Sequence, residues 1–109
     1  MSQQIQSKRY VADEPDSPGH TPVYVVDGDG RRELDKRLDL ANHSPDGFSW
    51  GHGESGPAQL ALAILADARG DDVAIQNYQE FKWVVIASTP ADEPLSVTES
   101  EIDSVVGDS

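Results

Sequence analysis

The sequence predicts an α+β domain in which a small N-terminal antiparallel sheet packs on a buried central helix, with two further helices beside it. Three observations point to this fold: β-branched residues flank two Asp-Gly steps near the N-terminus, one central segment is apolar on nearly every side, and two shorter segments follow helical spacing. With 109 residues, the chain buries one modest core and is too short for a two-domain enzyme. We expect residues 1–7 to be disordered, residues 8–106 to form the single domain, and residues 107–109 to be a tail.

Three short segments are expected to form the sheet. Residues 8–12 suit a strand, and residues 23–26 are β-branched and aromatic. The two Asp-Gly steps of residues 27–30 indicate a hairpin, because Asp and Gly tolerate positive φ. The return strand is therefore expected over residues 31–34.

The central helix is expected over residues 57–69. Apolar side chains cover nearly its whole circumference from Leu60 to Ala66, which is typical of a helix that is buried on all sides. Ser55 or Gly56 is predicted to cap its N-terminus, since hydroxyl residues and glycine are favoured at that position.

The C-terminal third is expected to hold a second helix, an edge strand and a last short helix. The second helix begins at Asp71, and residues 83–86 fit its continuation as well as they fit a strand. Leu95 and Val97 suit a short edge strand. Residues 98–101 begin with Thr and end with Glu, the capping-box pattern that opens a helix.

One motif is more specific than the rest of the chain. It consists of SPDGFSWG at residues 44–51 and SGPAQLALA at residues 55–63. It resembles the core SPDGFxWGYGGSGPAQLALALL of a small domain family of unknown function, and the resemblance extends from about Arg37 to Ile102. The resemblance implies a shared fold and a setting in haloarchaea and bacteria, often on plasmids or in viral and proviral regions, but it implies no mechanism.

The motif contains a glycine-rich loop with the spacing of a dinucleotide-binding fingerprint, Gly51-x-Gly53-x-x-Gly56. Its context argues against nucleotide binding, because no apolar parallel strand precedes it and Glu54 places an anion inside the supposed phosphate loop. A generic phosphate or carboxylate site at the helix start stays open as an alternative.

Metal binding finds little support in the same region. Four of its side chains are suitable ligands for first-row metals: His43, Asp46, His52 and Glu54. Their spacing matches no established zinc pattern. Local turn hydrogen bonds are the preferred explanation for Asn42, His43 and Asp46, so we predict neither a metal site nor a cofactor.

Catalytic chemistry finds little support either. Ser55 is not part of a hydrolase elbow, because Pro57 stands where that elbow needs glycine. We predict no catalytic residue and favour a protein without enzymatic activity. If the region binds a small ligand, the candidate binding loop comprises Asn42, His43, Asp46, Trp50, His52, Ser55, Gly56 and Gln59.

Two further features concern partners. Trp83, if it points outward from the second helix, is suited to anchor a protein interface, where tryptophan is enriched. The basic cluster of residues 31–37 is interrupted by two acids, so we expect it to form a salt-bridged hairpin. The remaining charge of the chain argues against direct nucleic-acid binding.

The chain is strongly acidic, with 20 Asp and Glu against 8 Lys and Arg and a net charge of −12. In ordinary salt this charge would cost stability through self-repulsion, whereas in molar salt the repulsion is screened within a few ångströms. An Asp-rich, Lys-poor domain with a core resembles proteins of halophilic archaea. We therefore interpret the charge as a signature of habitat and expect folding to need high salt.

Cysteine usage and hydropathy bear on the compartment. The chain has no cysteine, which excludes a disulfide framework, a thiolate nucleophile and a Cys-ligated zinc site. Its longest apolar stretch, within residues 60–66, is too short to span a bilayer, and its N-terminus does not look like a signal peptide. We expect a cytoplasmic protein.

The leading functional hypothesis is a small acidic accessory protein from a haloarchaeal plasmid, virus or provirus. It would act without catalysis, through contact with a protein partner that the sequence does not identify. One alternative is an acidic mimic of nucleic acid that inhibits a nucleic-acid-binding protein. Another is a small-ligand or phosphate binder, or an enzyme, that uses the glycine-rich loop.

Overall fold

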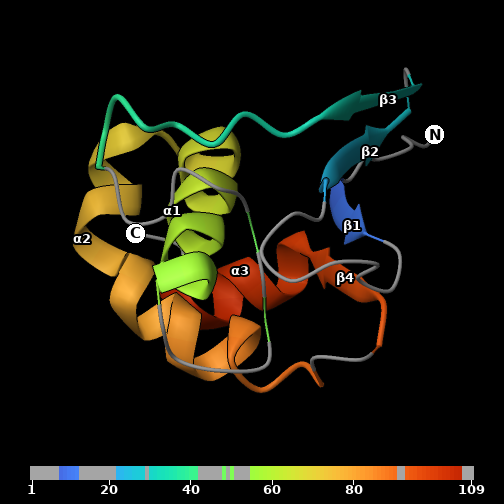
Figure 1. Ribbon diagram of the computed structural model, residues 1–109. Helices are drawn as coiled ribbons and strands as arrows, with labels where there is room; N and C mark the ends of the chain where they lie inside the picture. Colours follow the sequence, from blue (N-terminus) through green and yellow to red (C-terminus); the bar gives the residue numbers. More distant parts are fainter. Residues whose placement is uncertain are drawn as a thin grey trace, which may run out of the picture.

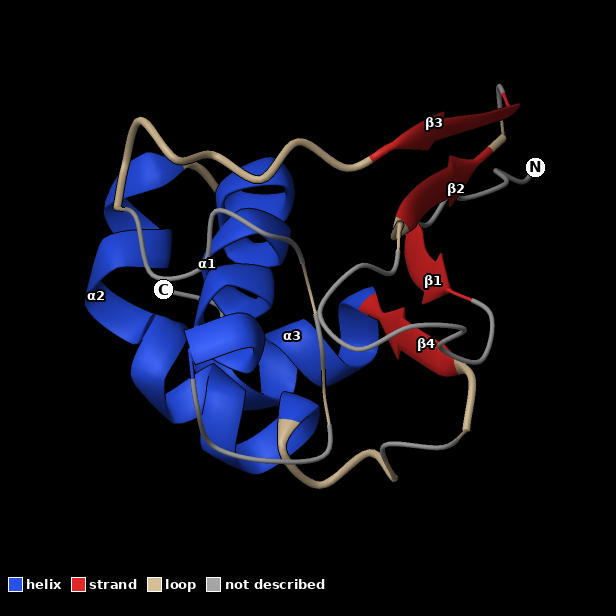
Figure 2. Cartoon of the chain, viewed as in Figure 1, coloured by secondary structure: helices blue, strands red, loops and turns tan. Residues whose placement is uncertain are grey.

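The computed structural model describes residues 8–12, 22–28, 30–41, 48, 50, 55–90 and 93–106, and the structural statements below concern these residues. They form the strands β1 (Arg9–Ala12), β2 (Tyr24–Asp27), β3 (Gly30–Glu33) and β4 (Leu95–Thr98), the α-helices α1 (Ser55–Arg69), α2 (Asp71–Phe81) and α3 (Glu99–Val106), and the π-helix η1 (Lys82–Ile86). Figure 1 shows the strands gathered on one side of the molecule and α2 on the other, with α1 between them. The helices and the sheet thus form two layers, as the predicted α+β class requires (Figure 2).

The sheet is antiparallel, with the strand order β3-β2-β1-β4. Its first three strands confirm the predicted hairpin and the strand before it. The fourth strand, β4, comes from the C-terminal part of the chain and pairs with β1, so that Tyr10 lies opposite Val97. The predicted edge strand is therefore present, and it joins the N-terminal strands in one sheet.

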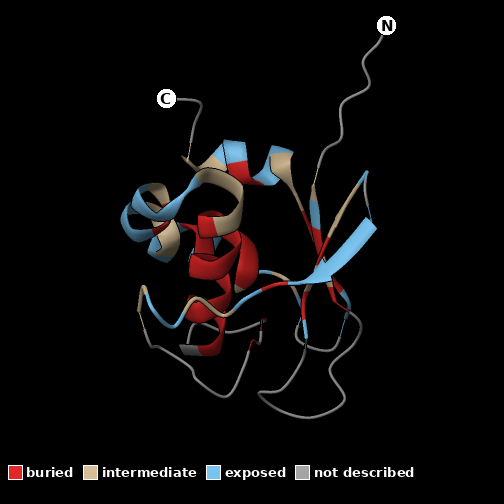
Figure 3. Ribbon diagram, turned by 90° about the horizontal axis from the view of Figure 1, so that it is seen from above, coloured by how far each residue is buried: buried red, intermediate tan, exposed pale blue. Residues whose placement is uncertain are grey.

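Helix α1 is buried on nearly every side, as its composition predicts. Each residue from Leu60 to Leu65 is 0% exposed. Figure 3 shows this buried helix at the centre, with the sheet on one side and the partly exposed helices on the other. One continuous core joins α1 to inward-facing side chains of the sheet, including Tyr10 and Val25, and to Phe81 of α2. Helix α1 is therefore the centre of the core.

The start of α1 differs from the prediction. The helix begins at Ser55, two residues earlier than expected, so Ser55 and Gly56 lie in its first turn rather than at its cap. Pro57 is compatible with this earlier start, because N–H groups of the first turn have no partner within the helix. At the other end, Gly70 adopts a φ of 100°, a left-handed value that lets the chain turn directly into α2.

The C-terminal elements resolve one ambiguity and confirm one motif. Residues 83–86, which fit either a helix or a strand, belong to the π-helix η1 (Lys82–Ile86), which continues α2. The capping box opens α3 as predicted: the N–H of Thr98 donates to Oε1 of Glu101 at 2.9 Å, and the N–H of Glu101 donates to Oγ1 of Thr98 at 3.3 Å. Ile102 then anchors α3 in the core.

Candidate functional site

The candidate binding loop lies only partly within the described residues. Four residues of the candidate loop lie outside the described ranges, as does the rest of the glycine-rich segment 51–54: Asn42, His43, Asp46 and His52. The other four lie within the described ranges: Trp50, Ser55, Gly56 and Gln59. Across the described ranges, no group of three or more His, Cys, Asp or Glu side chains is arranged to hold a metal ion. Ligand binding by the loop therefore stays a prediction.

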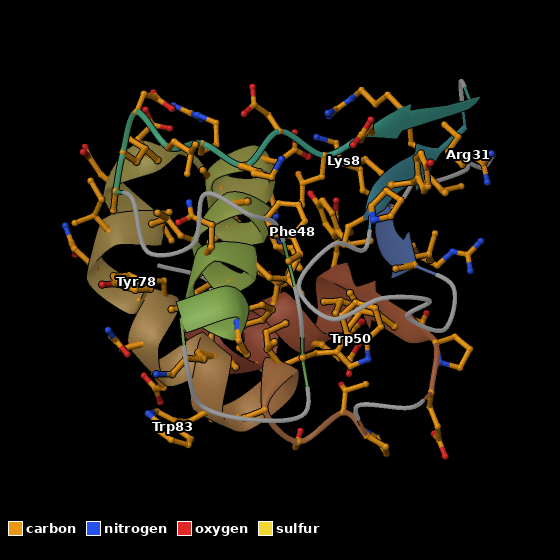
Figure 4. The ribbon with its side chains drawn as sticks, in the orientation of Figure 1. Lys8, Arg31, Phe48, Trp50, Tyr78 and Trp83 are labelled. Atoms are coloured by element: carbon orange, nitrogen blue, oxygen red, sulfur yellow. The ribbon has the colours of Figure 1, made fainter. Side chains whose placement is uncertain are left out.

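Trp50 is part of the core. Its residue surface is only 2% exposed, and its indole Nε1 donates a hydrogen bond of 2.9 Å to the main-chain carbonyl of Glu93. Phe48, two residues earlier, is also buried, and Figure 4 shows Phe48 beside the central helix and Trp50 near β4. The hydrogen bond of Trp50 therefore links the motif to the segment that precedes β4.

Gln59 is a buried polar residue on α1. Its Nε2 donates hydrogen bonds to the carbonyls of Lys36, at 2.6 Å, and Ala41, at 3.1 Å. A buried amide is costly unless it is hydrogen-bonded, and here main-chain carbonyls accept from its donor group. Gln59 thus holds the segment between β3 and the motif against α1. This contact gives Gln59 a structural part in the fold.

Sequence reasoning missed the main polar cluster, which is centred on Asp67 near the end of α1. The hydroxyl of Tyr10 donates to Oδ2 of Asp67 at 2.7 Å, and a guanidinium nitrogen of Arg32 donates to Oδ1 at 2.7 Å. The Nζ of Lys8 lies 3.4 Å from Oδ2. Asp67 therefore joins α1 to β1 and β3. The one sequence signal was an acid placed directly after a run of apolar helix residues.

The cluster shifts the acidity of its members. Burial alone would raise the pKa of the Asp67 carboxyl, but hydrogen bonds from Arg32 and Tyr10 and the charge of Lys8 hold that pKa below its usual value. Burial, followed by the hydrogen bond to Asp67, raises the pKa of the Tyr10 hydroxyl above its ordinary value. Both shifts favour an ionised Asp67 that accepts from a neutral Tyr10, which is the arrangement of a structural link.

An exposed surface with both apolar and polar side chains follows α2 and η1 on the side away from α1. Its residues recur in adjacent pairs at every fourth position, and we call them together the α2–η1 face: Ile75, Gln76, Gln79, Glu80, Trp83 and Val84. In an α-helix with 3.6 residues per turn, such pairs would drift by about 40° per repeat. The wider π turn at residues 82–86 offsets this drift and keeps the last pair on the same side.

Large side chains on this face are left in solvent. Ile75 is 52% exposed, Trp83 is 59% exposed and Val84 is 53% exposed. The Nζ of Lys82 lies 4.5 Å from the centre of the Trp83 ring, a cation–π contact that helps to orient the indole. Figure 4 shows Trp83 at the periphery, directed away from α1. The condition that would make Trp83 an interface anchor, an outward direction, is therefore met.

The basic cluster is partly salt-bridged, and its ion pairs reach beyond the hairpin. Arg32 pairs with Asp67, and Arg37 pairs with both Asp39 and Asp71. Arg31 instead lies over the ring of Tyr24, 4.6 Å from its centre. Two of the four cations of this segment are thus held in ion pairs among the described residues.

Together these features describe a small α+β domain whose sequence motif supports its core. The family model "Family of unknown function (DUF6166)" matches residues 16–108, and the chain belongs to this family. The resemblance that the motif carries is thereby confirmed. No curated protein and no solved structure matched the chain.

We predict that Gln59→Leu lowers the free energy of unfolding by about 1–3 kcal/mol, because it leaves the part-buried carbonyl groups of Lys36 and Ala41 without this donor. The matched control is Gln76→Leu on the exposed side of α2, which should change stability by less than about 0.5 kcal/mol. Denaturant unfolding followed by circular dichroism measures both. Equal midpoints for Gln59→Leu and the wild type would contradict the structural part assigned to Gln59.

We predict that Asp67→Asn lowers the free energy of unfolding by about 1–3 kcal/mol at neutral pH, since hydrogen bonds with a charged partner are lost. The pKa of Asp67 is lower in the folded chain than in the unfolded chain. Its carboxylate therefore stabilises the fold above the unfolded pKa of about 3.9, and this stabilisation disappears as the pH falls through the lower, folded value.

The difference in free energy of unfolding between wild type and Asp67→Asn should accordingly shrink toward zero as the pH is lowered from neutral to about 3 or below. The control Asp72→Asn removes an exposed carboxylate of α2 and should show no comparable convergence. A stability difference between wild type and Asp67→Asn that stays constant over this whole range would argue against the assigned link.

Proposed function

We propose that this protein is a small, non-catalytic accessory protein that works by binding a partner protein through the α2–η1 face. The observation that carries the proposal is the exposure of Trp83 on this face. The chain has only two tryptophans, and the other one, Trp50, is buried in the core. A large aromatic ring left in solvent gains most from association, which is why tryptophan is enriched among interface residues that dominate binding.

The neighbours of Trp83 extend the apolar surface. Ile75 and Val84 are each about half exposed on the same face. Complete burial of a fully exposed apolar side chain contributes about 1.5–3 kcal/mol, and these three are already about half buried, so each contributes only part of that. A partner that covers all three residues offsets part of the cost of association. Short π segments of this kind often occur at functional sites, which is a second reason to place the interface here.

The charge around the face indicates the chemistry of its partner. Glu80 lies within the face, and Asp72 precedes it on the exposed side of α2. Asp71 is already paired with Arg37, so it is less available to a partner. We infer a partner surface with an apolar hollow for Trp83 and basic side chains at its edge.

The proposed setting is the cytoplasm of a halophilic archaeon, with the protein encoded by a plasmid, virus or provirus. The acidic, Lys-poor composition and the absence of cysteine support this setting, as does the sequence motif. No described helix combines the length and the apolar character that crossing a membrane demands.

The described carboxylates give no support to a nucleic-acid mimic, which would need them along one ridge. They occur on β3, on the segment after it and on all three α-helices, and several are held in ion pairs. Such scattering is what adaptation to salt produces. The ligand-binding alternative depends on a loop whose central residues lie outside the described ranges.

We predict that Trp83→Ala abolishes recovery of a stoichiometric partner from a high-salt lysate of the natural host, while leaving the fold intact. The matched control is Leu38→Ala, which removes another exposed apolar side chain, 39% exposed, from a different part of the surface. Because Trp83 contributes little to the core, its removal should lower the free energy of unfolding by less than about 1 kcal/mol.

Affinity capture with tagged wild type and with both variants, in molar potassium chloride, provides the measurement. The proposal expects equal recovery by wild type and Leu38→Ala, and at least a tenfold loss (about 1.4 kcal/mol) with Trp83→Ala. Undiminished recovery by Trp83→Ala would refute the assigned face. Recovery of no partner by the wild type, together with a detected turnover activity, would refute the non-catalytic function itself.

A further inference from the structure

The sheet has a second face, which the helices do not cover. Side chains alternate between the faces of a strand, and the inward set of the inner strands and β4 is buried. The outward set forms two cross-strand rows, which we call the open sheet face: Arg31, Val26, Arg9 and Thr98 in one row, and Glu33, Tyr24, Val11 and Ser96 in the other. Arg9 and Arg31 are exposed, whereas Tyr24 and Val26 are half-buried.

Arg9 and Arg31 are exposed cations on the open sheet face. Lys8, Arg32, Arg37 and Arg69 pair with carboxylates, whereas no ion pair among the described residues includes Arg9 or Arg31. Arg31 stacks on Tyr24 instead. The two arginines stand two strands apart in one row, about 10 Å from each other across Val26. Within the part of the chain that the structure describes, this row thus carries two cations that no carboxylate pairs with.

The open sheet face and the α2–η1 face are complementary. The first presents two arginines and Glu33 beside half-buried Val26 and Tyr24. The second presents exposed Trp83 and Val84 beside Glu80, with the Nζ of Lys82 over the Trp83 ring. We propose that the open sheet face of one copy binds the α2–η1 face of a second copy. This inference rests on the proposed function, because it names a second copy of the chain as the partner of the Trp83 surface.

The two faces lie at opposite ends of the molecule. Figures 1 and 3 show the sheet at one end and α2 at the other, with α1 between them. An interface between two different patches is heterologous, so each bound pair still carries one free face of each kind. Such contacts extend into a ring or an open filament rather than stopping at a dimer.

Other occupants of the open sheet face fit the observations less well. A nucleic-acid strand has phosphates for the two arginines but no apolar side chains to cover the half-buried Val26. A second copy brings the acidic and apolar groups that the arginine row lacks, and it is present wherever the protein is.

A mixing experiment with two single-face variants tests the proposal. Trp83→Ala removes the anchor of one face, and the double variant Arg9→Glu with Arg31→Glu reverses the charge of the other. In sedimentation equilibrium in molar potassium chloride, the average molecular mass of the wild type is expected to rise with concentration to more than that of a dimer. Each variant alone is expected to remain a monomer. Mixed in equal amounts, the variants share one intact interface, so their average mass should rise about twofold and stop at a dimer.

Every other result decides against head-to-tail assembly. If wild type stays monomeric while Trp83-dependent capture of a different protein persists, this inference fails and the proposed function stands. If neither assembly nor capture is seen, both fail. If only Trp83→Ala blocks association and the arginine variant still forms dimers, the α2–η1 face pairs with itself. If wild type binds a labelled oligonucleotide and the arginine variant does not, the row that contains Arg9 and Arg31 binds a polyanion instead of a second copy. The milder double variant Arg9→Gln with Arg31→Gln replaces the charge reversal if circular dichroism shows that the latter misfolds.

Discussion

Complete burial of α1 is the constraint on which the rest of the structure depends. A helix that is apolar around its whole circumference must be covered on every side, and in a chain of 109 residues there is little other structure to cover it. The inner face of the sheet covers one side, α2 with η1 covers another, and the segment after β3 covers more of it. Hydrogen bonds from α1 reinforce two of these contacts. Gln59 bonds to the segment after β3, and Asp67 bonds to the strands β1 and β3 of the sheet.

The residues of the sequence motif and the residues of the proposed interfaces are different ones. The conspicuous motif side chains that the structure describes, Phe48, Trp50 and Gln59, are buried and serve the core. The surfaces left for partners are the outer side of α2 and η1 and the outer side of the sheet. In both cases the opposite side of the same elements packs against α1. The layers that complete the core therefore also present the proposed interfaces on their outer sides.

Elements with local signals could be predicted from sequence. The Asp-Gly hairpin, the capping box at Thr98 and the apolar circumference of α1 each depend on residues a few positions apart. The pairing of β4 with β1 and the cluster at Asp67 depend on residues far apart in the chain, and composition carries no trace of them. The form of residues 83–86 is ambiguous in the sequence because the β-branched residues there suit a strand, and packing of Val85 and Ile86 into the core decides for a helix.

The central claim, that α1 is the innermost element and that α2 with η1 is an outer cover, is tested most directly by native-state hydrogen exchange in molar potassium chloride. The account predicts that amides of Leu60 to Leu65 exchange only through global unfolding, with the same free energy that denaturant unfolding gives. Amides of η1 should open at lower free energy. Exchange of the α1 amides at a free energy equal to or below that of η1 would contradict the account.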